Sequence, residues 1–129
     1  MEYSPEVVRR FGSARRAGEL ATGSAGLVSG EAEDRTLGVW VRFQLQVSDG
    51  IVRAARFAAF GCPHTIAAAD SAAERLEGAR ASEIEGLDVR VIQRELGVPV
   101  EKLGKLLRIE DALAACGRAL ANKGSLTRD

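Results

Sequence analysis

The feature that most constrains the fold is a run of alternating residues between positions 39 and 47. Apolar side chains stand at the odd positions, and the positions between them hold Trp40, Arg42, Gln44 and Gln46. Successive side chains of a β-strand point to opposite faces, so this run predicts a strand with one buried face. Asp49-Gly50 and a second apolar run over residues 51–60 follow it, and together they predict an antiparallel hairpin.

A helix signal precedes this hairpin. Ser4 suits the N-cap position and Pro5 suits the first helical turn, and Gly12 is expected to end the helix. The predicted inner face of this helix consists of Val7, Val8 and Phe11. Residues 17–35, which are rich in Gly, Ser, Ala and acidic residues, predict a long loop with a short edge strand around residues 25–28.

Helix signals also dominate the sequence after the hairpin. Gly61-Cys62-Pro63 interrupts the second strand, and an alanine-rich helix is predicted over residues 64–77. A short helix with a capping box between Ser82 and Glu85 comes next. Asp88 is expected to cap another short helix.

The last helix is predicted over residues 101–123, with Gly124 at its end. Its buried stripe consists of Leu103, Leu106, Leu113, Cys116 and Leu120. Strands followed by helices predict an α+β fold, in which helices pack on one face of a small antiparallel sheet made of the hairpin plus an edge strand. The covered face of the first hairpin strand is expected to consist of Val41, Phe43 and Leu45.

The bulk composition limits the class of protein. A chain of 129 residues suits a single domain over residues 1–129, with flexible ends at 1–3 and 125–129. Eighteen basic and eighteen acidic residues cancel, so no general attraction to nucleic acid or to an anionic membrane is expected. Neither a membrane span nor a signal peptide is recognisable, so a cytoplasmic protein is expected. One basic cluster is interpreted as a solvated helix end and turn, and it consists of Arg9, Arg10, Arg15 and Arg16.

Several segments, taken in chain order, carry a likeness to a known family. They are Tyr3-Ser4-Pro5-Glu6-Val7, Gly18, the stretch from Asp49 to Cys62, residues 66–78, the stretch from Gly97 to Leu103, and Ile109-Glu110-Asp111-Ala112. In this series the chain resembles the IscU / NifU N-terminal family of iron–sulfur cluster assembly scaffolds over nearly its whole length. The resemblance implies an IscU-like fold and a non-enzymatic role. As partners it implies a cysteine desulfurase or an Hsp70-type chaperone.

The chain departs from the family pattern at the metal site. The family holds its cluster with three cysteines, assisted by an aspartate and a histidine, and only the second cysteine is kept, as Cys62. By register, the other positions hold Leu37, Val39, Gly104 and Lys105. An iron–sulfur cluster usually needs four thiolate or imidazole ligands. The resemblance implies a [2Fe–2S] cluster or zinc, but stable binding by the monomer is therefore not expected.

Two interpretations of the role of Cys62 remain open. It precedes a predicted helix start, where the helix dipole and free N–H groups favour a thiolate, so it could be a reactive thiol or a lone metal ligand. It could also be a half-buried residue without a role. His64 is a further candidate ligand, although a structural or exposed histidine is the more common case. For Glu31, Glu33 and Asp34, a solvated acidic loop is favoured over oxygen ligands.

The favoured hypothesis is a divergent scaffold paralogue linked to iron–sulfur cluster assembly, which acts through protein contacts. The segment that corresponds to the family's chaperone-recognition motif is then the candidate partner site, and it consists of Val98, Pro99, Val100, Glu101 and Lys102. The alternative is a thiol-based sulfur carrier or redox module that uses Cys62. The sequence leaves open whether the protein is a monomer or a homodimer.

Overall fold

The computed structural model describes residues 3–23 and 25–126, and a three-stranded antiparallel sheet forms its centre. The strands lie in the order β1-β2-β3 and span Leu27–Asp34, Val39–Ser48 and Ile51–Phe60. The α+β fold class predicted from the order of the elements is confirmed.

The predicted hairpin is present between β2 and β3, with Phe43 paired opposite Phe57. Its turn lies at Asp49 and Gly50, whose φ angles are 53° and 73°. Positive φ at both central residues matches the twist of the flanking strands, and Asp and Gly tolerate this conformation better than most residues. A register shift between Gln46 and Val47 adjusts the pairing next to this turn.

The edge strand is longer than the sequence predicts. A short strand was expected around residues 25–28, but β1 continues to Asp34. The residues Gly30 to Asp34 have low intrinsic strand preference, so the local signal is weak. Two tertiary contacts make the strand possible: β1 pairs along its whole length with β2, and Gly30 is buried against the last helix.

The described residues include six helical segments. They are α1 (Pro5–Gly12), α2 (Pro63–Leu76), the 3₁₀ segment η1 (Ala81–Gly86), α3 (Val89–Leu96), the 3₁₀ segment η2 (Val100–Lys102) and α4 (Leu103–Leu126). Two predicted N-caps are confirmed, because the Ser4 side chain accepts from Val7 N and Asp88 accepts from Arg90 N.

Three predicted helix boundaries are wrong. The predicted capping box at Ser82 is replaced by a bond two residues earlier, in which Arg80 N donates to the Glu83 carboxylate. The last helix begins at Leu103, after the separate turn η2, and it continues past Gly124 to Leu126. Glycine lowers helix preference by only about 1 kcal/mol, which a long packed helix tolerates. The flexible ends at 1–3 and 125–129 remain a prediction, and residues 1–2 and 127–129 lie outside the described residues.

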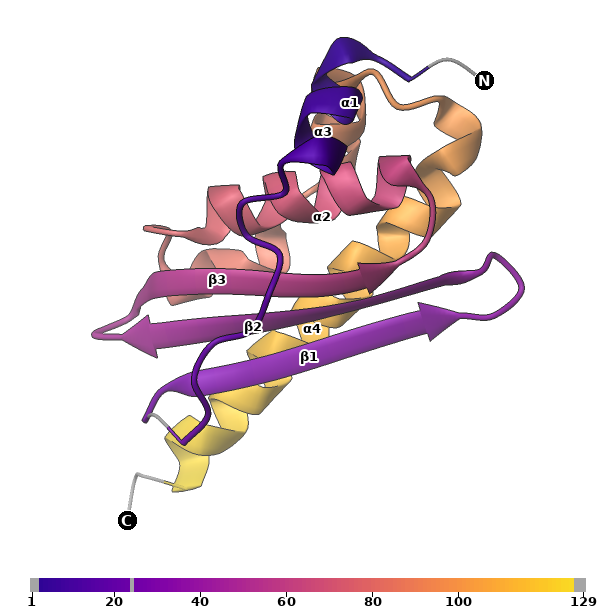
Figure 1. Ribbon diagram of the computed structural model, residues 1–129. Coiled ribbons are helices and arrows are strands. Elements are labelled where there is room, and N and C mark those ends of the chain that lie inside the picture. Colours follow the sequence, from indigo (N-terminus) through magenta and orange to yellow (C-terminus); the bar gives the residue numbers. More distant parts are fainter. Residues whose placement is uncertain (1–2, 24, 127–129) are drawn as a thin grey trace.

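The helices cover one face of the sheet, as expected. In Figure 1, α2 and α4 lie against this face, and α1 and α3 lie beyond α2. The segment between α1 and β1 crosses the opposite face, where Leu20 N donates to the Gln44 side chain at 2.8 Å and Glu19 pairs with Arg42 at 3.1 Å. The second face of the sheet is therefore partly covered by chain and not by a helix.

The core lies between the sheet and the pair α2 and α4. Its β2 contribution is the predicted one, since Val41, Phe43 and Leu45 are fully buried. The small side chains of α2 let the helix approach the sheet closely, and the fully buried ones are Ala67, Ala68, Ala69, Ala72 and Ala73.

The inner face of α1 differs from the prediction. Val7 is buried, but Val8 is 57% exposed and Phe11 is 49% exposed. Arg10 lies inward instead, at 8% exposure. The basic cluster at this helix is therefore not simply a solvated helix end, because its second arginine is part of the interior.

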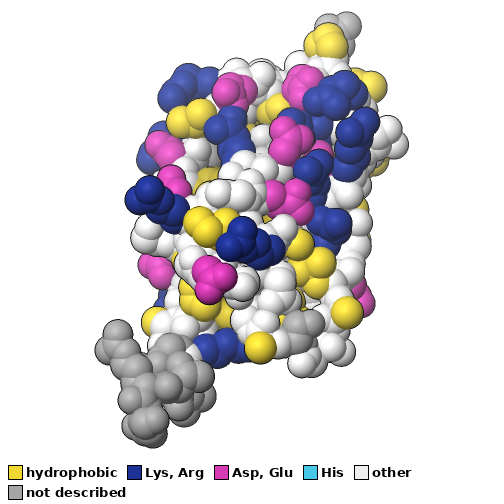
Figure 2. All heavy atoms as spheres, turned by 90° about the vertical axis from the view of Figure 1, so that its left-hand side faces the viewer, with side chains coloured by type: hydrophobic (Ala, Val, Ile, Leu, Met, Phe, Trp, Pro, Cys, Tyr) yellow, Lys and Arg dark blue, Asp and Glu magenta, His cyan; other side chains and the backbone are white. Residues whose placement is uncertain are grey.

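The remaining surface carries mixed charge. Figure 2 shows one face of the molecule, on which basic and acidic side chains are intermixed. Among the helices of the described residues, none has the length and apolar character needed to cross a membrane.

Candidate functional site

Three segments that are distant in the sequence converge at one end of the sheet. They are the turn between β1 and β2, the junction of β3 with α2, and the first turn of α4. Leu37 lies against the start of α4, because a methyl group placed on Gly104 would be 3.6 Å from Leu37 Cδ1. Lys105 lies close enough to Cys62 to lower the pKa of its thiol. We call this region, built from Leu37, Cys62, Gly104 and Lys105, the Cys62 end.

Acidic residues shape the turn of the Cys62 end. Asp34 accepts a hydrogen bond from Leu37 N at 3.0 Å and lies 3.8 Å from the Arg108 guanidinium on α4. Glu31 accepts from the Trp40 indole at 2.9 Å, and Glu33 lies 3.6 Å from Arg35. These contacts give the three carboxylates structural partners. No group of three His, Cys, Asp or Glu side chains suited to a metal ion occurs in the part of the chain that the structure describes.

Cys62 is half-buried at the N-cap position of α2. Its Sγ lies 3.7 Å from the Thr65 hydroxyl. Burial acts to raise the pKa of the Cys62 thiol, but the backbone and hydroxyl of Thr65, the backbone of His64 and the charge of Lys105 outweigh it. The net pKa lies below the ordinary value, so the structure favours a thiolate more than burial alone would.

His64 is a buried residue and not a surface ligand. Its side chain is 1% exposed, and its ring centroid lies 4.7 Å from that of Tyr3. Neither ring nitrogen has a hydrogen-bond partner among the described residues. Burial, followed by the charges of Lys102 and Lys105, lowers the pKa of His64. A neutral imidazole is therefore packed here, and it would need to be uncovered before it could bind a metal.

Exposed apolar side chains lie on or next to the segments that form the Cys62 end, and the sequence pattern did not reveal them. Leu37 is 39% exposed, and Phe60 and Val100 are each 71% exposed. We call these three residues the apolar rim. Phe60 ends β3 opposite Trp40, and a hollow of about 220 Å³ lies between it and the β1–β2 turn. The position of Phe60 two residues before Cys62 was the only sequence signal for its location.

The predicted partner segment, residues 98–102, is buried at its first residue and exposed in its middle part. Val98 is buried, and its carbonyl oxygen accepts from the Gln93 side chain at 2.6 Å. Pro99 and Lys102 are half-buried, whereas Val100 and Glu101 are exposed. A partner at this segment would therefore contact Val100 and Glu101, because Val98 is unavailable.

The two cysteines are expected to differ strongly in reactivity. Cys116 is fully buried against β2, where its thiol donates to the Phe43 carbonyl, and burial raises its pKa to about 12. In the folded protein, a maleimide should therefore modify Cys62 first. Timed labelling followed by peptide mass spectrometry measures this order. Labelling of Cys116 at the same rate under native conditions would contradict both environments.

Comparisons with known proteins find relatives along nearly the whole chain. The family model described as the NifU-like N terminal domain matches residues 2–125. The iron–sulfur cluster assembly scaffold protein IscU of Azotobacter vinelandii is 29% identical over 127 residues, which cover 98% of this chain and 99% of the relative. The protein of the same name from Escherichia coli K12 is 28% identical over 116 residues, which cover 89% and 91% of the two chains.

Solved structures give the same fold. The N-terminal NifU-like protein from Brucella abortus superposes with a TM-score of 0.70 at 20% identity, covering 92% of this chain and 94% of that chain. A cluster assembly scaffold protein for the SUF system from Fervidobacterium islandicum has a TM-score of 0.68 at 13% identity, covering 89% and 96%. At these identities the similarity establishes the architecture.

Proposed function

Because this chain belongs to the NifU-like N terminal domain family, we propose that it takes part in iron–sulfur cluster assembly as a divergent scaffold paralogue. In this role it acts through protein contacts and does not hold a complete cluster by itself. The curated relatives are cluster assembly scaffold proteins, which supports the general assignment. The proposal includes a non-enzymatic role and a cytoplasmic location.

The observation that carries this proposal is the composition of the Cys62 end. The segments that the family resemblance assigns to metal ligands meet there, but they present one thiol. Leu37 has no donor atom, and Lys105 ordinarily carries a positive charge that opposes a nearby cation. Cys116 does not replace a missing ligand, because it lies roughly 16 Å beyond Lys105 along the axis of α4, at a helical rise of 1.5 Å per residue. The residues therefore do not fit a cluster of the usual ligand number.

The same end offers a surface for protein contact. The apolar rim exposes Leu37, Phe60 and Val100 on or next to the three segments that meet at the Cys62 end. Large exposed apolar side chains grouped together are typical of interaction sites, and aromatic residues dominate binding at such sites. We propose that a partner from the assembly machinery, a cysteine desulfurase or an Hsp70-type chaperone, contacts this rim.

Binding to a cysteine desulfurase tests the proposal. In analytical ultracentrifugation, the wild-type chain should form a complex with the desulfurase, and Val100→Asp should weaken it by about tenfold, because a charge is placed in an apolar contact. Val8→Asp is the matched control, since Val8 is an exposed valine of α1 outside the rim. Equal weakening by both variants would contradict the assignment of the rim. No complex with either partner class would contradict the proposed function.

The alternative role has one observation in its favour. The lowered pKa of Cys62 favours the thiolate, which is the nucleophile that attacks the outer sulfur of a donor persulfide in sulfur transfer or a sulfur of a disulfide in redox exchange. Mass spectrometry after incubation with a desulfurase and cysteine separates the two roles. A stoichiometric addition of sulfur to Cys62 would support the carrier, and an unmodified thiol in a stable complex would support the contact role.

A further inference from the structure

Helix α1 is attached to the rest of the molecule with little apolar burial. Val7 is its only fully buried apolar side chain, while Val8 and Phe11 face outward. The Ser4 hydroxyl adds one bond, donated to the Leu96 carbonyl at the end of α3. The other buried residue of the helix is Arg10. The attachment of α1 therefore depends on what surrounds this arginine.

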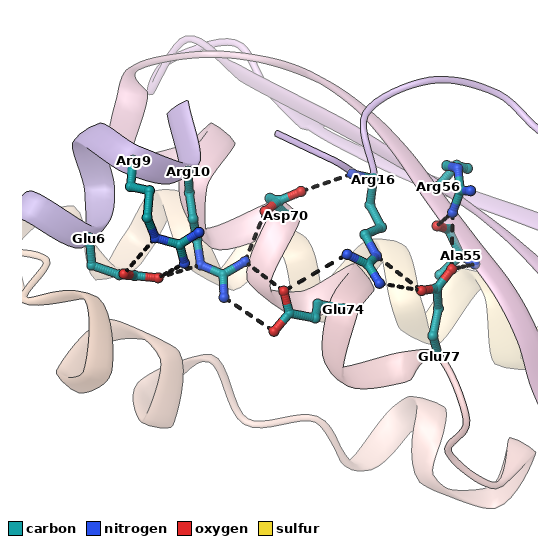
Figure 3. A network of polar contacts seen from close by, with 9 residues as sticks. All are labelled: Glu6, Arg9, Arg10, Arg16, Ala55, Arg56, Asp70, Glu74 and Glu77. Carbon is teal, nitrogen blue, oxygen red and sulfur yellow. Dashed lines mark hydrogen bonds and ion pairs between the residues drawn. The ribbon is translucent and has the colours of Figure 1, made fainter. Parts of the chain in front are cut away.

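Arg10 is held by carboxylates from two helices, as Figure 3 shows. Its guanidinium lies 2.8 Å from Asp70 and 3.3 Å from Glu74, both on α2, and 2.9 Å from Glu6 on its own helix. Asp70 is 3% exposed. The ion pair between Arg10 and Asp70 is thus excluded from water, where loss of one partner leaves the other charge buried and unpaired.

The network continues into the segment that follows α1. Arg16 N donates to the second oxygen of Asp70 at 3.0 Å, and the Arg16 guanidinium lies 2.8 Å from Glu77. Glu77 in turn accepts from Ala55 N at 3.0 Å on β3 and lies 3.0 Å from the Arg56 guanidinium. One carboxylate, Asp70, therefore fastens both α1 and the segment after it to α2.

We propose that residues 4–18 form a latch that opens as a unit while the sheet, α2 and α4 stay folded. The latch is held by the charged contacts, by the one buried apolar side chain of α1, Val7, and by two backbone hydrogen bonds of 2.9 Å that Arg16 and Gly18 form with Phe57 on β3. The rest of the fold is held by the apolar core, so the two parts have different free energies of opening. Opening would carry Tyr3 away from His64, because Tyr3 directly precedes the latch and its ring centroid lies 4.7 Å from that of His64, with the two rings tilted by 57°. The latch would thereby control exposure of the imidazole that lies two residues from Cys62.

The charges facing the latch set the direction of its pH dependence. Hydrogen bonds from Arg9 lower the pKa of Glu6, and those from Arg10 lower the pKa of Glu74. Burial acts to raise the pKa of Glu77, but Ala55 N, Arg16 and Arg56 lower it overall. The other charged groups around the network are Asp70, Arg75 and Glu95. Lowered carboxylate pKa values stabilise the closed latch above the ordinary value of 4.5, and this stabilisation is lost as the pH falls through the lowered values.

Native-state hydrogen exchange on the full chain tests the latch directly. In low concentrations of denaturant, amides of residues 5–18 should exchange through an opening of lower free energy and weaker denaturant dependence than amides of β2. Their protection should also fall before that of β2 as the pH is lowered toward 4. If residues 5–18 and β2 showed the same opening free energy and the same denaturant dependence, the proposal would be overturned. This outcome does not depend on the behaviour of any variant.

Modification of the single histidine gives a second measurement. Asp70→Asn removes the charge that both parts of the latch share, so diethyl pyrocarbonate should modify His64 on the order of a hundredfold faster than in the wild type. Glu33→Gln is the matched control, because Glu33 is in an exposed ion pair on β1, and it should react as the wild type does. Unchanged modification of His64 in a folded Asp70→Asn variant would contradict the link between latch and imidazole.

Discussion

Reconstituted with iron and sulfide in the absence of oxygen, the monomeric protein is expected to carry no stoichiometric iron–sulfur cluster. A cluster distributes its charge over several thiolates held at fixed positions, and the Cys62 end provides one. Gel filtration, visible absorbance and iron analysis of the monomer fraction measure the outcome. A stoichiometric cluster on the monomer would contradict the proposed contact role and require ligands that the described residues do not bring together.

Restoring the ligands should reverse this result. Leu37 lies against Gly104, and Lys105 lies close enough to Cys62 to act on its thiol. The double variant Leu37→Cys/Lys105→Cys would therefore place three thiols at the Cys62 end and should gain cluster binding. The control Ser29→Cys/Ser82→Cys adds the same number of thiols at exposed positions elsewhere and should stay without a cluster. Equal binding by both double variants would indicate nonspecific capture by surface thiols.

A dimeric cluster is the remaining alternative for the wild-type chain. Two copies of Cys62 and His64 together offer two sulfur and two nitrogen donors, a set compatible with zinc or with a Rieske-like centre. The structure adds a requirement to this route, because His64 is buried beneath Tyr3 and would have to be uncovered. A cluster confined to the dimer fraction and absent in Cys62→Ala would support the bridged site.

The substitution Gly30→Ala should be strongly destabilising, although it adds only one methyl group. Gly30 lies where β1 meets α4, and a methyl group there would be 2.5 Å from Cys116 N and would overlap the Ala112 carbonyl. Both obstacles are backbone atoms, so relief requires the helix to move away from the sheet. We expect a loss of about 1–3 kcal/mol in the free energy of unfolding, measured by urea denaturation monitored by circular dichroism.

Gly12→Ala is the control for this prediction. Gly12 is the last residue of α1, and a methyl group there would meet no atom within 4 Å. Its effect should stay within about 0.5 kcal/mol in either direction, as for most exposed positions. Equal stability of the Gly30→Ala and Gly12→Ala proteins would show that α4 does not pack on β1 as closely as described.

Strong local patterns predicted the central part of the fold. The alternation over 39–47 determined which face of β2 is buried, and Asp49-Gly50 determined the turn. The length of β1 was underestimated, because the strand depends on pairing with β2 and on contact between Gly30 and α4. Neither contact produces a periodic pattern of residues in the sequence. Gly124 failed as a helix end for a similar reason, since neighbouring turns can carry a helix past one unfavourable residue.

For the candidate site, the family register predicted which segments would meet but not which of their side chains are exposed. The register placed Leu37, Gly104 and Lys105 beside Cys62, and the structure brings them together. The sequence register did not reveal that Val98 is buried or that Phe60 and Val100 are exposed. Exposure of an apolar residue depends on which segments cover it, and those segments are distant in sequence.

The sequence by itself determined the hairpin, two helix caps and the alanine-rich helix, because each follows from residue types at short spacing. Only the tertiary structure decided that Arg10 is buried with Asp70, 60 residues away along the chain. A charged residue normally favours water, and it accepts burial only where a distant partner compensates for the lost solvation. That compensation is a property of the folded arrangement, so no local pattern around Arg10 could have predicted it.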